Sequence, residues 1–316
     1  MRAVLALATL LGLCFLTPEI AAAQTPDSTS VPPASADLGA VDSTAVDSTA
    51  AKTSASSRSR SVAGRAKHMV KSFASDVGYV VVSPTRLRGR GIVYTAAAVG
   101  ATVALYGYDN EIRRGFFRSR GNALYDDAIT VGDKLEKVGF MGKTWPYWVG
   151  GALVGTAFKI HPLQGLCLDV IESHLISGGV RNIAKLAIGR EHPFEAERAS
   201  FFKHGTSAPS GHTSVVYEIA TVATRHTHGM PTPVRIGVGV TTYGIATCIA
   251  MQRVDSNSHW PSDVFLGGVS GAVIANTVVN RNNERREKDG LTAGGPRLTP
   301  WIDATGTPGV ALAWSF

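Results

Sequence analysis

Long apolar stretches, rich in glycine and alanine, follow one another along most of this chain after residue 90. Stretches of this length favour helices over strands. Glycine and proline residues separate them, for example at Gly121, Pro162 and Pro231, and such residues are typical of helix boundaries. We therefore expect an all-α protein, with helices near residues 91–108, 122–140, 145–159, 163–188, 211–226, 234–251 and 262–281.

The first 23 residues have the pattern of a secretory signal peptide. Arg2 precedes the apolar run 3–16, and residues 21–23 are three alanines, the small residues that a cleavage site requires. The apolar run is too short to span a membrane. We expect Gln24 to begin the mature chain and the protein to be exported to the bacterial cell envelope.

The segments on either side of the helices differ from them in composition. Residues 24–65 are mostly Ser, Thr, Ala, Asp and Pro, with no aromatic residue and no periodic apolar face, which predicts a disordered linker. The helical domain then covers 66–289. Residues 290–316 form a C-terminal tail in which 297–303 and 310–316 alternate apolar and polar positions around a turn at 307–309. This pattern predicts a short β-hairpin that packs on the bundle.

Composition leaves two arrangements of the helices open. The chain is 44% hydrophobic and only 17% charged, which excludes a wholly disordered chain and a highly charged solenoid. The stretches 91–108, 236–251 and 264–280 carry no charged side chain before their ends, and each is near the short limit of a membrane span. The charged stretch 122–140 would not cross a bilayer unaided. A membrane-embedded bundle and a soluble periplasmic bundle both fit.

The net charge of +7 suits anionic partners such as phosphates or acidic lipid surfaces. Basic clusters follow alternate helices, so an up-and-down bundle would gather them at one end. A positive cytoplasmic face produces this pattern, and so do cations at helix C-termini. The clusters are Arg113, Arg114, Arg118 and Arg120, then Arg225 and Arg235, then Arg281, Arg285, Arg286 and Lys288.

Three short motifs carry the candidate chemistry. Each lies where an expected helix begins or ends, at 185–193, 208–214 and 253–263. The ordinary alternative is a set of solvated side chains and a helix cap, but the three motifs together are hard to explain in that way. They supply nine candidate site residues: Lys185, Arg190, His192, Ser210, Gly211, His212, Arg253, His259 and Asp263.

The third motif alone suggests a reactive histidine. His259 and Asp263 are four residues apart at a helix start, so their side chains can lie on one face. A carboxylate bound to one imidazole nitrogen fixes the tautomer and frees the other nitrogen as a nucleophile or base. Arg253 can reach back with a planar guanidinium that suits phosphate oxygens.

The other two motifs complete an oxyanion site. Ser210 and Gly211 at a helix start expose backbone N–H groups to an anion, and His212 beside them could protonate a leaving group. Lys185 and Arg190 add positive charge. Such a set binds an oxyanion and stabilises its transfer. No cluster of carboxylates offers a magnesium site, and no cysteine spacing offers a metal site, so we expect neither a metal nor a cofactor.

These motifs resemble those of the type 2 phosphatidic acid phosphatase family, which shares its fold with class A bacterial acid phosphatases and vanadium haloperoxidases. The family pattern is Lys, six residues, Arg-Pro; then Pro-Ser-Gly-His; then Ser-Arg, five residues, His, three residues, Asp. The resemblance covers about residues 85–282. It implies a multi-helix, up-and-down bundle of the acid phosphatase and haloperoxidase type.

The resemblance also implies roles. His259 would be the nucleophile that forms a phosphohistidine, Asp263 would orient it, and His212 would be the general acid. The implied phosphate ligands are Lys185, Arg253 and the amides of Ser210 and Gly211.

Two positions depart from the family pattern. His192 stands where the family has the arginine before proline, and Gln252 replaces the serine before Arg253. A neutral imidazole is a poor substitute for a guanidinium, so Arg190 is the candidate that compensates. Reduced activity, a changed substrate and a decayed site all stay open.

The expected function is metal-independent hydrolysis of a phosphate monoester or diphosphate. We expect a phosphorylated lipid, or else a small phosphate ester, and no nucleic acid partner. Helix counting puts the motif end opposite the basic clusters, which predicts an inner-membrane protein whose site faces the periplasm. The alternatives are a vanadate-dependent haloperoxidase and a non-catalytic envelope protein.

Overall fold

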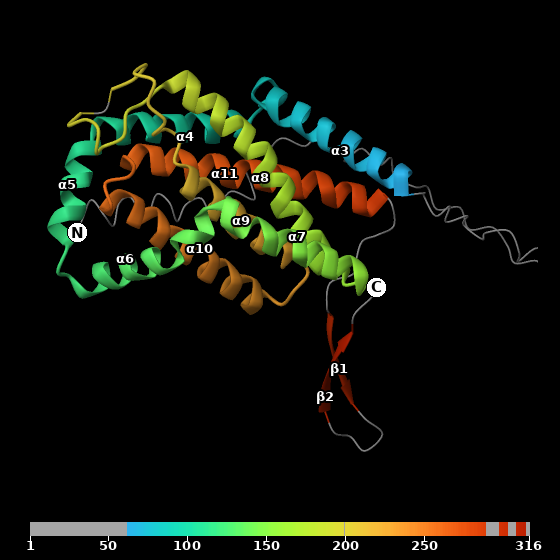
Figure 1. The fold of residues 1–316 in the computed structure, drawn as a ribbon. Coiled ribbons are helices and arrows are strands. Elements are labelled where there is room, and N and C mark those ends of the chain that lie inside the picture. The colour runs from blue at the N-terminus through green and yellow to red at the C-terminus, as the bar shows by residue number, and fades with distance from the viewer. Residues whose placement is uncertain (1–61, 199, 289–296, 303–307, 314–316) are drawn as a thin grey trace, which may run out of the picture.

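The computed structural model describes residues 62–198, 200–288, 297–302 and 308–313 (Figure 1). The predicted signal peptide and nearly all of the predicted linker lie outside the described residues. Two short 3₁₀ helices are present, η2 (Ser83–Arg86) and η3 (Glu136–Gly139). The α-helices are α3 (Val62–Val82), α4 (Arg90–Gly107), α5 (Asp109–Ser119), α6 (Ala123–Leu135), α7 (Met141–Ala157), α8 (His161–Ile188), α9 (Gly211–His226), α10 (Thr232–Asp255) and α11 (Pro261–Lys288).

The expectation of an all-α bundle is confirmed, and an α-helix lies at each of the seven expected places. The expected helix 122–140 is divided into α6 and η3. Two helices were not expected. α3 begins at Val62, inside the predicted linker, and α5 follows α4 after a single residue, Tyr108.

The sequence explains why α5 is a separate helix. Asp109 and Glu111 lie in its first turn and Arg118 in its last, the charge distribution that the helix dipole favours. Ile112 and Phe116 are buried on one face. Because α4 and α5 are bent by 69° at their junction, α5 crosses the end of the bundle instead of extending α4.

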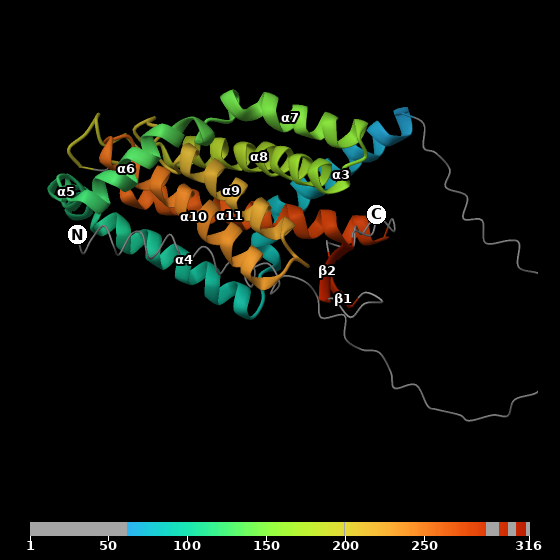
Figure 2. The ribbon, with the colours of Figure 1, turned by 90° about the horizontal axis from the view of Figure 1, so that it is seen from below.

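The two helices that carry the second and third motifs, α9 and α11, lie at the centre of the bundle (Figures 1 and 2). α8 packs against both, with α7 outside it, and α10 packs against α9, with α6 outside it. α4 and α3 pack against successive parts of α11. Both central helices are therefore shielded along most of their length.

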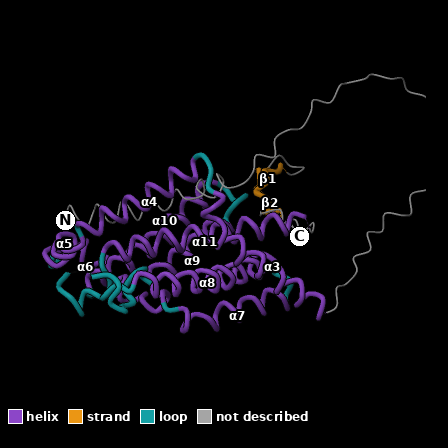
Figure 3. Tube along the Cα trace, turned by 90° about the horizontal axis from the view of Figure 1, so that it is seen from above, coloured by secondary structure: helices purple, strands orange, loops and turns teal. Residues whose placement is uncertain are grey.

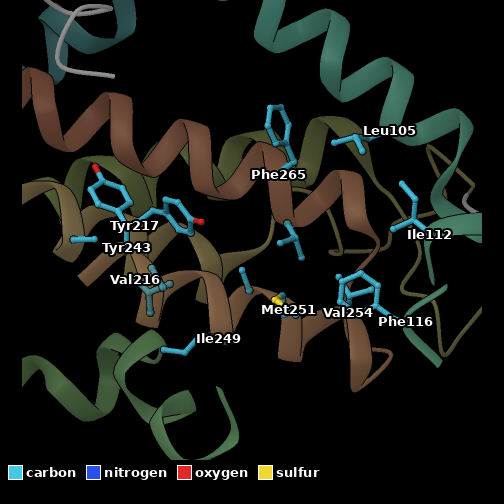
Figure 4. Packing of buried hydrophobic residues seen from close by; sticks show 14 of the residues in the cluster. Leu105, Ile112, Phe116, Val216, Tyr217, Tyr243, Ile249, Met251, Val254 and Phe265 are labelled. Carbon is cyan, nitrogen blue, oxygen red and sulfur yellow. The ribbon is translucent and has the colours of Figure 1, made fainter. Parts of the chain in front are cut away.

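The largest hydrophobic cluster fixes the helix ends that lead into the third motif (Figure 4). It joins side chains of α4, α5, α6, α9, α10 and α11. Val254 and Val264 are fully buried in it, each next to a residue of that motif. Burial of a side chain of this size stabilises a fold by roughly 1.5–3 kcal/mol, so the motif is held from both sides.

A glycine allows α11 to approach the start of α9. A Cβ atom at Gly267 would lie 2.5 Å from the carbonyl oxygen of Ser210. The backbone N–H of Ser210 donates to the carbonyl oxygen of Asp263 at 3.0 Å. The second and third motifs are thus joined through their backbones.

One basic cluster lies where the sequence analysis did not expect it. In α5, Arg113 donates to the side chain of Asn257 at 2.5 Å, and Arg120, just after α5, donates to Asp255 at 2.9 Å. Both acceptors belong to the third motif: Asp255 is the last residue of α10, and Asn257 lies between α10 and α11. This cluster therefore lies at the motif end, because the bend after Tyr108 folds α5 across it. The expectation that all basic clusters lie opposite the motifs is wrong.

Two helices of the described part of the chain, α10 and α11, are long and apolar enough to cross a membrane, judged by length and composition alone. A third span is present if the bent pair α4 and α5 counts as one. The apolar part of α11 is 78% buried inside the protein, against 33% for α10. α10 instead exposes apolar side chains, as does α4, including Val103 and Val240. The exposed apolar side chains of α4 and α10 are typical of a membrane-associated protein.

Near the C-terminus, β1 (Arg297–Ile302) and β2 (Pro308–Ala313) pair in antiparallel fashion. Residues 303–307 between them lie outside the described residues. The expected hairpin turn and its packing on the bundle therefore stay predictions.

Candidate active site

The three motifs meet at one end of the bundle, where the loops after α8 and α10 gather beside α5 (Figure 3). His259 is at the centre of this group. Burial lowers the pKa of its imidazole well below the usual value, so the ring is neutral. Four neighbouring groups lower the pKa of His259 further: His192, Lys185, Arg253 and His212. Five of the predicted site residues are therefore close enough to interact electrostatically.

The backbone around His259 is tightly held. The N–H of His259 donates to the carbonyl oxygen of Arg253 at 3.0 Å. The next residue, Trp260, is fully buried, and its indole N–H donates to the carbonyl oxygen of Glu191 at 2.9 Å. These bonds tie the third motif to the first and fix the direction of the His259 side chain.

Asp263 lies on the Nδ1 side of His259, as the spacing predicted. Its Oδ2 atom is 4.0 Å from His259 Nδ1 and accepts a hydrogen bond from the Trp260 N–H at 3.2 Å. The hydroxyl of Ser207 also donates to Oδ2, and Ser207 Oγ lies 3.5 Å from His259 Nδ1. Ser207 therefore bridges the carboxylate and the imidazole. No motif marks Ser207, and the sequence analysis missed it.

Arg190 lies on the other side of Asp263 and is only 2% exposed. One terminal nitrogen, Nη1, donates to Asp263 Oδ1, and the other, Nη2, donates to Asp109 Oδ2 at 2.5 Å. The sequence analysis expected Arg190 among the phosphate ligands. In this unliganded structure its guanidinium binds two buried carboxyl groups, because α5 brings Asp109 against the start of α11. Asp109 was not among the predicted residues.

His192 lies beside His259, with 5.1 Å between the ring centroids. Its Nδ1 donates to the carbonyl oxygen of Ser258 at 2.7 Å, and its Nε2 is 3.4 Å from the hydroxyl of Thr206. Phe194 stacks on the same ring at 5.0 Å. The residue that replaces the family's arginine is therefore part of the site.

The predicted cations Lys185 and Arg253 approach from α8 and α10. The Lys185 ammonium donates to the carbonyl oxygen of Thr206. Arg253 is buried; its Nε donates to the Gln252 side chain at 2.7 Å, and its Nη2 lies 3.0 Å from Glu136. Gln252, the second departure from the family pattern, thus orients Arg253. Glu136, in η3, was not predicted.

The second motif forms the start of α9, as expected. The N–H of Ser210, expected to bind phosphate, instead donates to the carbonyl oxygen of Asp263 at 3.0 Å. Gly211 is the first helical residue, and the first N–H groups of a helix have no partner within it. Ser210 is fully buried, so this helix start faces the interior of the site. Arg181 of α8 lies beside it, since its Nε would be 3.6 Å from a Cβ at Gly211. Backbone donors and a cation together make an anion cradle.

His212 follows in the first turn of α9. Its ring lies against Phe140, with 6.2 Å between the centroids. Burial, and then repulsion from Arg253, lowers the pKa of His212 to about 4. In the unliganded protein at neutral pH its imidazole is therefore uncharged.

The described residues contain no group of three or more His, Cys, Asp or Glu side chains that could hold a metal ion. Cys167 and Cys248 are both free thiols.

A neutral histidine backed by a carboxylate, surrounded by cations and facing a helix start, defines a site for binding and transferring an oxyanion. The model of the PAP2 superfamily matches residues 166–287, which contain all three motifs. The lipid A 1-phosphatase of Porphyromonas gingivalis is 29% identical over 213 residues, which is 65% of this chain and 41% of that protein. Residues 166–287 of the chain therefore resemble the PAP2 superfamily, as their motifs indicated.

The match spans less than half of the length of that relative. No solved structure matches the chain significantly.

Proposed function

We propose that this protein is a phosphatase that hydrolyses a phosphate monoester or diphosphate of a lipid, through a phosphohistidine on His259 and without a metal ion. One observation carries the proposal. The buried His259 imidazole is neutral, is backed by Asp263 on its Nδ1 side, and is surrounded by the cations expected to bind phosphate. A neutral imidazole has a free electron pair on Nε2, which makes it a nucleophile at neutral pH.

In the first step, Nε2 of His259 attacks phosphorus, the P–N bond forms and the bond to the leaving oxygen breaks. His212 gives its proton to that oxygen. Lys185, Arg253 and the N–H groups at the start of α9 bind the other phosphate oxygens and stabilise their charge. In the second step, water attacks phosphorus and gives a proton to His212, the P–N bond breaks and inorganic phosphate leaves.

The uncharged state of His212 is compatible with its role as an acid. Lys185 and Arg253 help to lower its pKa in the empty site. A bound phosphate dianion offsets the field of these cations and so raises the pKa of His212. His212 is therefore expected to take up its proton when the substrate binds.

Two features support a lipid as the substrate. The relative from P. gingivalis is a lipid A 1-phosphatase. A crevice of about 100 Å³ lies between α8 and α11; Pro209, which precedes Ser210 of the anion cradle, is one of its lining residues, and most of the others are apolar. A small phosphate ester would fit the polar part of the site equally well but would leave this crevice unfilled.

The test is release of phosphate by the purified protein in detergent with EDTA, with phosphatidic acid, a polyprenyl diphosphate and a lipid A phosphate as substrates. We expect turnover of at least one lipid, and a ³²P label that stays on the protein in alkali and is lost in acid. His259→Ala should lose both. A protein that turns over no lipid phosphate supports the non-catalytic alternative, and activity abolished by EDTA contradicts the metal-free mechanism.

We also propose that the chain is organised as a signal peptide (1–23), a linker that ends where α3 begins, a helical phosphatase domain and a C-terminal hairpin tail.

The contacts of α3 bear on the orientation of the helical bundle relative to the membrane. Asp76 in α3 pairs with Arg281 and Arg285 near the end of α11, so the start of the domain lies opposite the site. If the bundle crossed a membrane, the active site and the N-terminal end of the helical domain would lie on opposite sides of that membrane.

The expected signal peptide delivers the start of the mature chain to the periplasm. A site that also faces the periplasm therefore requires a bundle that does not cross the inner membrane but is held on its periplasmic side by the exposed apolar surface of α4 and α10. We propose this arrangement. It can be tested with a membrane-impermeant maleimide on intact cells, in a variant without Cys167 and Cys248.

Arg114→Cys, at the motif end, and Glu284→Cys, at the other, are the matched reporters, because both side chains are exposed. We expect both to react. Reaction of only one of them means that the bundle spans the membrane.

A further inference from the structure

Arg190 and Asp109 both form hydrogen bonds to the first turn of α11. Arg190 Nη1 donates to the Ser262 hydroxyl oxygen at 2.7 Å as well as to Asp263. Asp109 Oδ1 accepts from the Ser262 N–H at 2.9 Å, and its Oδ2 accepts from the Ser262 hydroxyl at 2.7 Å. Asp109 thereby caps α11, and both carboxylates are fixed by the same guanidinium.

Aromatic rings surround the guanidinium of Arg190. The centroids of Tyr106, Phe201 and Trp260 lie 5.2 Å, 5.5 Å and 5.4 Å from the guanidinium carbon of Arg190. Such rings attract a cation and exclude water, and in a dry environment each charged hydrogen bond is stronger than in solvent. The guanidinium of Arg190 is therefore held both by hydrogen bonds at its terminal nitrogens and by the rings around it.

The two carboxyl groups share one cation. One guanidinium faces both Asp109 and Asp263. Burial raises the pKa of both carboxyl groups, and the charge of Arg190 opposes that rise. Oδ1 of Asp263 is occupied by Arg190, so Oδ2 is the atom that faces Ser207 and His259. A carboxylate oxygen held at that place stabilises the positive charge that the ring acquires when its Nε2 is phosphorylated.

We infer that Arg190 and Asp109 are positioning residues: they bind Asp263 and Ser262 so that one carboxylate oxygen of Asp263 stays directed at the Nδ1 side of His259. The inference rests on the proposed phosphohistidine mechanism. It gives Arg190 a role different from that of a phosphate ligand, and the two roles predict different kinetics.

A positioning residue acts on the chemical step and not on phosphate binding. For Arg190→Gln and Asp109→Asn we expect kcat to fall by about 10- to 100-fold, the range typical of groups that orient a catalytic residue. KM and the inhibition constant of inorganic phosphate should stay within about twofold. Arg253→Gln is the matched control, because it removes an expected phosphate ligand and should raise both constants. If Arg190→Gln raises the inhibition constant as much as Arg253→Gln does, Arg190 binds phosphate and the inference is overturned.

A double-mutant cycle tests whether Arg190 acts through Asp263. In an Asp263→Asn background, Arg190→Gln should change kcat by less than about threefold, because the carboxylate that it positions is gone. If the reductions in kcat caused by the two single variants multiply in the double variant, the inference is overturned. Arg190→Gln leaves buried carboxylates with too few donors and can fail to fold. Arg190→Lys, which keeps the charge, and Arg190→Gln with Asp109→Asn, which removes one carboxylate, are the alternative variants, and thermal melting monitors folding.

A spectroscopic readout separates this inference from the proposed function. The Nδ1 proton of His259, assigned by its absence in His259→Gln, should change its NMR chemical shift in Arg190→Gln and keep it in Arg114→Gln, an exposed arginine of α5. If the wild-type protein is inactive but the His259 resonance shifts only in Arg190→Gln, the phosphatase proposal is refuted and the positioning role of Arg190 is supported. An unchanged resonance in a folded Arg190→Gln protein would overturn the positioning role whatever the activity.

Discussion

The backbone N–H of Ser210 donates to the carbonyl oxygen of Asp263 at 3.0 Å, so the helix start that forms the anion cradle is attached to the residue behind the predicted nucleophile. These residues are 53 positions apart in the sequence and belong to different motifs. Their separation depends on how closely α9 and α11 approach each other. Packing between the two central helices therefore controls the geometry of the site.

The first prediction tests this control. In Gly267→Ala the new methyl group would lie 2.5 Å from the carbonyl oxygen of Ser210, so α9 has to move. Overpacking of this kind costs about 1–3 kcal/mol. We expect a lower melting temperature and at least a tenfold loss of kcat/KM for lipid phosphate hydrolysis.

Gly244→Ala in α10 is the matched control, because a Cβ atom there meets nothing within 4 Å. It should keep its activity and gain slightly in stability, since alanine favours a helix. Equal activity of the two variants would show that the approach of α11 to α9 does not set the site geometry.

A second prediction separates the two histidines. His259→Ala should lose all turnover, because every substrate needs the nucleophile. His212→Ala should retain p-nitrophenyl phosphate hydrolysis and lose that of alkyl phosphates, because only a basic leaving oxygen needs a proton. The measurement is kcat with both substrates. An equal loss on the two substrates contradicts the role of His212 as the general acid.

The third prediction concerns acid stability. The pKa of His212 is about 4 in the folded protein, below the ordinary value of 6.5. Between these values the unfolded chain binds more protons than the folded one, so stability present above pH 6.5 is lost as the pH falls. The loss that His212 contributes by pH 5 is on the order of 1–2 kcal/mol.

Melting temperatures at pH 7.5 and pH 5.0 measure this effect. His212→Gln should lose less stability over the interval than the wild type, although the buried His259 still contributes in the same direction. A variant with the same pH dependence as the wild type would show that His212 is not held neutral by the fold.

The sequence was sufficient to predict the helices whose boundaries are marked locally. α9 spans the expected residues because Ser210 and Gly211 define its start, and His192 lies beside His259 as its motif implied. Arg190 could not be placed in this way. Its partner Asp109 reaches it only because the chain bends at Tyr108 into a second helix, which the sequence analysis did not expect.

The same limit applies to Ser207 and Glu136. Ser207 contacts Asp263 across 56 positions, and Glu136 contacts Arg253 from a short 3₁₀ helix that the sequence analysis merged into a longer α-helix. A serine in a loop and a glutamate on a charged stretch carry no signal of their own. Residues that support a site from outside its motifs emerge only when the tertiary contacts are known.

The last prediction concerns His192, which stands in place of the family's arginine. Its Nε2 atom lies 3.4 Å from Thr206, and its ring is 5.1 Å from that of His259, so the side chain is near the position of a bound phosphate. A histidine side chain is positively charged only when it is protonated, whereas a guanidinium stays charged at any pH at which the protein is folded. His192→Arg should therefore keep its activity toward alkaline pH better than the wild type.

We expect a gain on the order of tenfold in kcat/KM at pH 8.5, which corresponds to about 1.4 kcal/mol of transition-state stabilisation. His192→Gln is the control, because it can also donate to the carbonyl oxygen of Ser258 but never carries a charge, so it should show no gain. If the arginine and glutamine variants have the same pH profile, charge at this position does not contribute to the reaction. His192 would then serve only to pack against His259, and the cations that bind phosphate would be Lys185 and Arg253.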